Sequence, residues 1–177
     1  QKHFQDYAKS IIQKYKIKSK SFCVDIGSND GSMLKSLKKN KMRVLGIEPC
    51  YDIAKKANAN GLKTINSFFD KNVVKKILDK NERPKLITLN YMFANIDNIL
   101  SFCKNLKSLL ADDGIIVIET GYHPEQMKNK MFDYVYHEHF SYFSLQNIKF
   151  IFNKIGLEIL SASITRPKGG SIRIIIQ

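Results

Sequence analysis

Cysteine, arginine and long apolar stretches are all scarce in this sequence of 177 residues. Its three cysteines, Cys23, Cys50 and Cys103, lie far apart and form no CxxC pair. This pattern excludes a disulfide framework and a cysteine-based metal site. No stretch approaches the roughly 18 consecutive apolar residues of a membrane-spanning helix, and residues 1–20 lack the apolar core of a signal peptide. We therefore expect a cytoplasmic protein with no membrane partner.

The formal net charge of +13 comes from 25 lysines and only four arginines, spread along the whole chain. Nucleic-acid sites typically gather arginines that bind phosphates in a bidentate manner. Because no such cluster is present, we expect a solvated basic surface and no nucleic-acid partner. The positive field still favours small polyanions, including a nucleotide-sugar diphosphate.

Short apolar strands alternate with amphipathic helices along most of the sequence. Strands are predicted over 21–26, 43–47, 63–65, 85–90 and 114–119, with helices over 32–40, 51–60, 70–80 and 96–110 between them. Strands of this kind indicate a parallel sheet covered on both faces. The aromatic segment 121–144 has no periodicity and is predicted to be a functional loop. A helix over 145–155 follows, and strands over 158–163 and 171–176 form an antiparallel hairpin.

This order of elements predicts an α/β fold of the class I methyltransferase, Rossmann-like type. It consists of a seven-stranded, mostly parallel sheet with a C-terminal antiparallel hairpin and helices on both faces. The expected domains are an N-terminal helical segment over 1–20 and a catalytic domain over 21–177, within a longer protein.

The turn over residues 25–31 (DIGSNDG) follows the first predicted strand. Ligands of open α/β sheets bind beyond the carboxyl ends of the strands, and Gly27 and Gly31 permit a tight turn there. Acids at Asp25 and Asp30 would repel a pyrophosphate and attract the amino and sulfonium groups of S-adenosyl-L-methionine (SAM). Glu48 ends the second strand, where an acid accepts hydrogen bonds from ribose hydroxyls. A solvated strand end is the alternative for Glu48.

Further cofactor contacts are expected where the third and fourth strands end. Phe68 is suited to stack on an adenine, although core packing explains it equally well. Asn90 and Tyr91 are expected near the methionine part of SAM. The predicted cofactor-binding residues are Asp25, Gly27, Ser28, Asn29, Gly31, Glu48, Pro49, Asn66, Ser67, Phe68, Asn90 and Tyr91.

Five segments, DIGSNDGSML, VLGIEP, GIIVIET, YHEHFSYFS and GGSIR, occur in this order along the chain. Together they resemble the SAM-dependent C-methyltransferases of deoxysugar biosynthesis, from about Ser21 to the C-terminus. The resemblance implies methylation at carbon 3 of a thymidine-diphospho-4-keto-deoxyhexose, with S-adenosylhomocysteine as product. It also implies an N-terminal zinc-binding domain with paired cysteines, which this sequence lacks before Ser21. Asn95 departs from the family, whose members tend to have histidine there.

Carbon methylation beside a ketone requires a base and a group that stabilises the enolate oxygen. The resemblance assigns His139 as the base and places Tyr136 and Glu138 near the reacting sugar. The ordinary pKa of histidine, about 6.5, suits proton transfer at neutral pH.

Two other interpretations of this segment stay open. His137 and His139 form an HxH pair that is able to bind a metal, although no metal is expected because no cysteine ligand lies nearby. Alternatively, the segment is a packing loop in which Tyr142 and Phe143 fill the core. The GGSIR residues Gly169, Gly170, Ser171 and Arg173 either border the substrate pocket or form a glycine-dependent hairpin turn.

The sequence therefore predicts an SAM-dependent methyltransferase acting on a sugar carbon. An O- or N-methyltransferase acting on a saccharide and a non-catalytic SAM-binding module are the alternatives. A nicotinamide-dependent oxidoreductase is disfavoured because the sequence has no GxGxxG motif.

Overall fold

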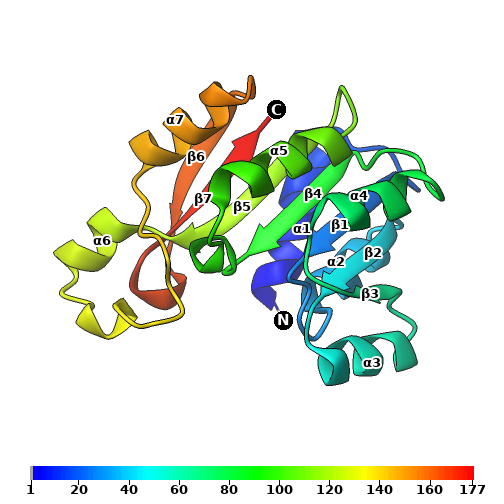
Figure 1. Ribbon diagram of the computed structural model, residues 1–177, viewed down its shortest axis with the longest axis horizontal. Helices are drawn as coiled ribbons and strands as arrows, with labels where there is room; N and C mark the ends of the chain where they lie inside the picture. Colours follow the sequence, from blue (N-terminus) through cyan, green and yellow to red (C-terminus); the bar gives the residue numbers. More distant parts are fainter. Residues whose placement is uncertain (1) are drawn as a thin grey trace. The chain divides into compact units, whose positions relative to one another are not determined.

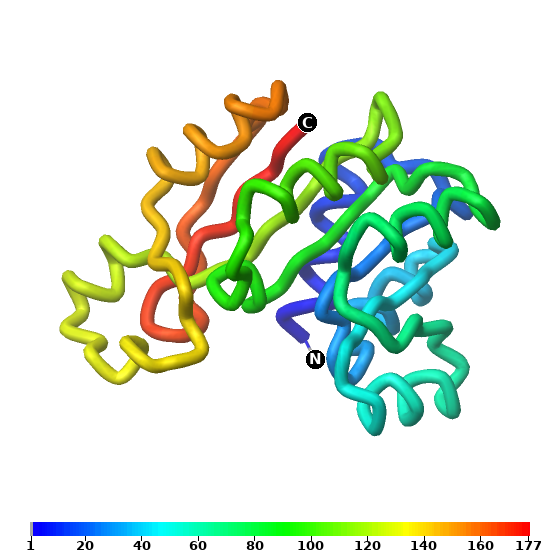
Figure 2. The backbone as a smooth tube through the Cα atoms, in the orientation of Figure 1, coloured from blue at the N-terminus to red at the C-terminus, as the bar shows by residue number. Residues whose placement is uncertain are grey.

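The computed structural model describes residues 2–177, which form an alternation of strands and helices followed by a hairpin (Figures 1 and 2). The strand order is β3-β2-β1-β4-β5-β7-β6. The predicted fold class, a seven-stranded mixed sheet with a C-terminal antiparallel hairpin, is confirmed. The strands are β1 (Phe22–Ile26), β2 (Arg43–Glu48), β3 (Thr64–Asn66), β4 (Leu86–Asn90), β5 (Ile115–Gly121), β6 (Ile159–Thr165) and β7 (Ser171–Ile176).

Helices connect these strands close to the predicted positions. Within the described residues, none of them is both long and apolar enough to cross a membrane. The α-helices are α1 (Lys2–Lys14), α2 (Ser32–Lys39), α3 (Tyr51–Ala59), α4 (Lys71–Leu78), α5 (Ile99–Leu109), α6 (His123–Lys128) and α7 (Leu145–Lys154). Three short 3₁₀ turns are η1 (Phe93–Asn95), η2 (Phe132–Tyr134) and η3 (Pro167–Gly169).

The chain divides into two units. The first unit comprises the residues up to Thr88 together with Leu109–Gly114. In it, β1 pairs in parallel with β2, and β2 pairs in parallel with β3. Every residue of β1 is buried, as expected for a central strand of a sheet covered on both faces. The helix α2 buries Met33, Leu34 and Leu37, the apolar face predicted from its spacing, and it packs against α1.

Local sequence signals fix the helix ends of this unit. Asp70 caps α4 because its side chain accepts a hydrogen bond of 2.8 Å from the Val73 amide. Gly61 follows α3 with a φ of +71°, the left-handed conformation in which helices commonly end.

The second unit comprises Leu89–Ser108 and Ile115–Gln177. In it, β7 pairs antiparallel with both β5 and β6, which confirms the predicted hairpin. Its core contains a cluster of aromatic rings, in which Phe93 lies against Phe102, Phe143 and Phe152 with ring centroids 6.4, 4.9 and 6.3 Å away. The packing alternative is thus correct for Phe143, which is only 4% exposed.

The prediction of a continuous loop over 121–144 was wrong in detail. The segment contains α6 and η2. Six residues make less than two helical turns, which is too short to produce a recognisable apolar period. Pro124 in the first turn of α6 is the remaining local signal of a helix start.

Candidate functional sites

The turn after β1 has a left-handed backbone, a conformation that glycine and asparagine adopt more easily than other residues. Gly27, Asn29 and Gly31 have φ values of +69°, +46° and +76°. The amides of Gly27 and Ser28 both donate to the Ile47 carbonyl, at 2.9 and 3.0 Å, which ties the turn to β2. A Cβ on Gly31 would overlap the Leu62 side chain. The glycine is therefore required both by its φ and by the close approach of Leu62.

Glu48 lies at the end of β2 and is only 7% exposed. One of its carboxylate oxygens accepts a hydrogen bond of 3.0 Å from the Asn29 amide, and the other accepts one of 2.9 Å from the Cys50 amide. Each carboxylate oxygen has a second lone pair. Glu48 thus links the turn after β1 to the start of α3, so it is not a freely solvated strand end. Its carboxylate still has lone pairs available for a ligand.

The two acids of the turn have different environments. Asp25 is 2% exposed, and its carboxylate accepts a hydrogen bond of 2.6 Å from the Thr88 hydroxyl. Asp30 is exposed, and it accepts hydrogen bonds from the Ser32 amide and hydroxyl at 3.0 and 2.8 Å. Partial burial alone would raise the pKa of Asp30, but these hydrogen bonds lower it. Asp25 therefore braces β1 against β4, whereas Asp30 caps the start of α2.

The ends of β2 and β3 contain the other predicted cofactor residues of this unit. The Asn66 amide donates to the Glu48 and Pro49 carbonyls at 3.0 and 2.8 Å, and the Ser67 amide donates to Glu48 at 3.2 Å. The Phe68 ring is 78% exposed. Core packing, the alternative explanation for Phe68, is thereby excluded.

Ser28 carries a buried hydroxyl that has no hydrogen-bond partner within the described residues. The hydroxyl lies over Gly46, where a Cβ would be only 2.6 Å from its oxygen. Gly46 and Glu48 lie two residues apart on β2 and so face the same side of the strand. A buried polar group without a partner is costly, which points to a ligand or water in its vicinity.

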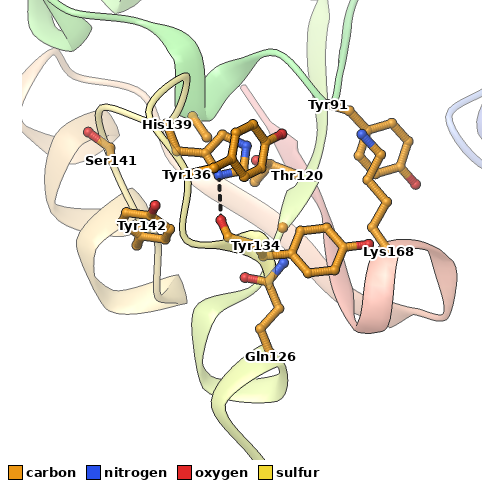
Figure 3. A pocket seen from close by; sticks show the side chains of 11 residues that line it. Tyr91, Thr120, Gln126, Tyr134, Tyr136, His139, Ser141, Tyr142 and Lys168 are labelled. Atoms are coloured by element: carbon orange, nitrogen blue, oxygen red, sulfur yellow. Dashed lines mark hydrogen bonds between the residues drawn. The ribbon is translucent and has the colours of Figure 1, made fainter. Parts of the chain in front are cut away.

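The second unit contains a small, open pocket beside His139 (Figure 3). Its walls come from the segment after β4 with η1, from β5, from α6, from η2 and the connection to α7, and from η3. The lining residues are Tyr91, Ala94, Thr120, Gly121, Gln126, Tyr134, Tyr136, His139, Ser141, Tyr142 and Lys168. Three predicted residues, Tyr91, Tyr136 and His139, therefore share one cavity.

The backbone carbonyl of Tyr134 fixes the His139 imidazole. The His139 Nδ1 lies 3.1 Å from this oxygen, as the dashed line in Figure 3 marks. A carbonyl only accepts, so Nδ1 carries a proton, and in the neutral form of the ring Nε2 then holds the lone pair that can act as a base. The Tyr136 ring lies at a centroid distance of 4.2 Å from the imidazole and the Tyr142 ring at 5.7 Å. These contacts orient the histidine from two sides.

The structure separates the remaining residues of this motif. Glu138 and His137 are exposed and do not line the pocket. Across residues 2–177, no group of three or more metal-binding side chains is present. Asn95, where relatives tend to have histidine, is exposed at the end of η1.

Glu119 on β5 is a fully buried carboxylate, 0% exposed. It forms an ion pair with Arg173, whose Nε donates at 2.7 Å, and it accepts a hydrogen bond of 2.6 Å from the Tyr91 hydroxyl. Burial and the Glu119 charge raise the pKa of Tyr91 well above its usual range. Arg173 thus pairs with Glu119 and does not line the pocket. Tyr91 lines the pocket as an uncharged ring that its hydrogen bond to Glu119 holds in place.

Four residues of the second unit, Glu119, Gln126, Tyr134 and Lys168, were not predicted as site residues from the sequence. Glu119 was predicted only as the last residue of an apolar strand, where a charge is unusual and is a usable signal. Lys168 directly precedes the glycine pair of the GGSIR motif. The GGSIR glycines prove to serve the hairpin turn, because Gly169 and Gly170 have φ values of +72° and +124°.

The fold and the turn after β1 together define a class of protein, the SAM-dependent methyltransferases. Solved structures of such enzymes from Clostridium acetobutylicum (TM-score 0.74, 12% identity, covering 99% of this chain and 91% of that one) and Archaeoglobus fulgidus (0.71, 14%, 97% and 93%) have this fold. So does the magnesium protoporphyrin IX methyltransferase of Synechocystis with bound S-adenosylhomocysteine (0.72, 11%, 99% and 81%).

Sequence comparison gives the family. A family described as a methyltransferase domain matches residues 1–162, and this chain belongs to it. The C-methyltransferase NovU of Streptomyces niveus is 31% identical over 170 residues, which are 96% of this chain and 40% of that protein. The chain thus spans about 40% of the length of the curated relative it matches. The predicted enzyme class, SAM-dependent methyltransferase, and its cofactor SAM are confirmed for this domain.

Proposed function

We propose that this domain transfers the methyl group of SAM to a carbon atom beside a ketone, in a nucleotide-activated deoxysugar. Two findings support the choice of carbon. The similar protein NovU is a C-methyltransferase, and in the second unit His139, whose Nδ1 donates to a carbonyl, lines a pocket together with several phenols. Oxygen or nitrogen methylation needs a base but no stabilised enolate.

The residues of the first unit fit SAM. The Glu48 carboxylate has free acceptor capacity for the ribose hydroxyls, and the exposed Phe68 ring is available to stack on the adenine. The turn over 27–31 permits a close approach of the ligand, and the Ser28 hydroxyl lacks a partner within the described chain. Bound SAM supplies an electrophilic methyl group on a sulfonium. Asp25 is buried and accepts a hydrogen bond from Thr88 on one carboxylate oxygen, so we propose that it contributes by holding β1 in place.

His139 is the proposed base. Its protonated Nδ1 donates to the Tyr134 carbonyl, so Nε2 accepts the α-proton of the ketone. The imidazolium that forms keeps the same hydrogen bond, which orients it throughout. Tyr136, whose ring lies 4.2 Å from the imidazole, is proposed to position the sugar. Glu138 is exposed, so a role near the sugar requires its side chain to turn inward when substrate binds.

Several finer predictions belong to the same proposal. Asn90 is half-buried at the end of β4 and Tyr91 lines the His139 pocket, and their contacts with SAM stay predictions. The boundary between an N-terminal segment over 1–20 and a catalytic domain over 21–177 is likewise a prediction. So is the association with a zinc-binding domain.

The fixed imidazole of His139 carries this proposal, and hydrogen exchange tests it. Full-length protein is incubated in deuterium oxide with a thymidine-diphospho-4-keto-deoxyhexose and without SAM, and deuterium at the α-carbon is followed by NMR. Wild type is expected to exchange, and His139→Ala is expected to lose about 10²–10⁴-fold in rate because the base is absent. His137→Ala is the matched control, since His137 is exposed and outside the pocket.

A second measurement confirms that the His139→Ala variant is folded. SAM should raise its melting temperature as it does for wild type, because ligand binding stabilises the native state by mass action. Unchanged exchange in His139→Ala, or methyl transfer to oxygen without any exchange in wild type, would contradict carbon methylation by this base.

A further inference from the structure

Lys168 is a cation in the wall of the His139 pocket that the proposed function does not use. It belongs to η3, in the turn that joins β6 to β7, and Figure 3 shows its side chain extending from this turn toward the ring of Tyr91. Its backbone is left-handed, with a φ of +54° and a ψ of +41°, as is that of four other lysines of the chain.

The contacts that fix this turn come from both of its ends. The Asn129 amide donates to the Gly169 carbonyl at 2.9 Å, and the Ser171 hydroxyl donates to the Pro167 carbonyl at 2.9 Å. A Cβ on Gly170 would lie 2.7 Å from the Glu125 Cβ, so α6 packs directly against the turn. Lys168 is therefore presented by a rigid support.

The surroundings of the Lys168 ammonium lack a counter-charge. Its Nζ lies 4.5 Å from the centroid of the Tyr91 ring. This ring cannot swing away freely, since its hydroxyl is bonded to the buried Glu119. No carboxylate of residues 2–177 forms an ion pair with Lys168. Burial lowers the pKa of Lys168, as expected for an ammonium that is partly removed from water without a negative partner.

We propose that Lys168 is a catalytic residue that holds the ketone oxygen of the substrate and stabilises the negative charge that develops there. This inference rests on the proposed function. When His139 takes the α-proton, the C–H electron pair forms a carbon–carbon double bond and the carbonyl π pair moves to oxygen. The ammonium faces this oxygen. As the carbon attacks the methyl group, the carbonyl re-forms, the S–CH₃ pair stays on sulfur, and His139 later releases its proton to water.

The other groups of the pocket are less suited to this task. Tyr134, Tyr136 and Tyr142 offer hydroxyls, which carry no permanent charge, and His139 is already proposed to take the proton. A preorganised positive charge stabilises an enolate oxygen more strongly than a neutral donor in a partly dry site. The enolate oxygen of the bound sugar also supplies the negative charge that the Lys168 ammonium otherwise lacks beside it.

The test compares Lys168→Met with Lys168→Arg in full-length protein. Methionine keeps an unbranched side chain of similar length and removes the charge, whereas arginine retains it. The α-proton exchange rate and the kcat and KM of methyl transfer are measured with the same thymidine-diphospho-4-keto-deoxyhexose. We expect Lys168→Met to lose about 10²–10³-fold in exchange rate and kcat, the effect of removing one oxyanion donor. Lys168→Arg should recover most of this loss. Lys149→Met is the control, because Lys149 is an exposed lysine of α7 that does not line the pocket.

The outcomes separate the two proposals. If wild type shows no exchange, the proposed function fails. If wild type exchanges and Lys168→Met exchanges equally fast, the role of Lys168 is overturned. A raised KM with unchanged kcat and saturating exchange rate also overturns it, because Lys168 then binds the diphosphate and not the reacting oxygen.

Discussion

The two candidate sites are built in opposite ways. The turn after β1 depends on backbone: three left-handed residues, two amides on one carbonyl, and a carboxylate that binds two further amides. The His139 pocket depends on side chains, mostly phenols, contributed by separate segments of the second unit. A site made of backbone needs glycine at fixed positions, whereas a site made of side chains needs a buried frame behind it.

Behind the His139 pocket, the buried Glu119 holds Tyr91 and Arg173 in place. Removing its carboxylate gives the largest expected loss of stability. Glu119→Ala leaves Arg173 without its partner in a largely buried position, so the free energy of unfolding should fall by about 3–5 kcal/mol. Urea denaturation measures the change. Asp113→Ala removes the exposed partner of Lys85 and should change stability little.

A double substitution sharpens this test. Replacing Glu119 and Arg173 together with Leu and Met should recover most of the lost stability, because no buried charge is then left unpaired. The assignment of Glu119 as the frame of the pocket is wrong if Glu119→Ala is as stable as wild type.

The glycines of the first unit allow a matched comparison of strain with close packing. Gly31 and Gly61 have similar φ values, +76° and +71°. A Cβ on Gly31 overlaps Leu62, whereas a Cβ on Gly61 meets no atom within 4 Å. Gly61→Ala should cost about 1–2 kcal/mol from backbone strain alone. Gly31→Ala should cost about 1–3 kcal/mol more. Equal losses in denaturation would show that Leu62 does not restrict this turn.

Phe68 tests whether the first unit uses any side chain for recognition. Its ring is 78% exposed, so truncation should leave stability unchanged. If it stacks on the adenine, Phe68→Ala should weaken SAM binding by about 0.5–1.5 kcal/mol, or roughly 2- to 12-fold. Calorimetric titration gives the affinity, and Phe150→Ala, an equally exposed ring at 68%, is the control. Identical affinities for all three proteins would remove Phe68 from the site.

The smallest expected effect is on the chemical modification of cysteine thiols. Because each unit buries one cysteine, their rates of modification compare how closed the two cores are. Burial raises the pKa of Cys23 in the first unit and of Cys103 in the second to about 12, while Cys50 is exposed. Below that pH the two buried groups stay as unreactive thiols. A disulfide reagent at pH 8 should therefore modify one cysteine in the native protein and three in urea. Fast modification of a second thiol in the native protein would show that Cys23 or Cys103 is accessible to the reagent, contrary to its burial.

The turn after β1 could be predicted from the sequence to a larger extent than the His139 pocket. The turn over 25–31 and Glu48 form a local pattern, because consecutive residues set the backbone and the strand end lies a fixed step further along. The His139 pocket could be predicted only in its motif residues. Tyr91, Gln126 and Lys168 are brought together by sheet pairing and by the six-residue helix α6, which have no sequence period of their own. The Glu119–Arg173 pair links positions 54 residues apart, and only the β5–β7 register brings them into contact.

We propose that the first unit holds the methyl donor through Glu48. Calorimetric titration of S-adenosylhomocysteine into wild type, Glu48→Ala and His139→Ala tests it most directly. We expect binding to wild type and to His139→Ala. Glu48→Ala should lose about 10- to 100-fold in affinity, equivalent to about 1.5–3 kcal/mol for hydrogen bonds to a charged group. Equal affinity for Glu48→Ala and wild type would contradict it.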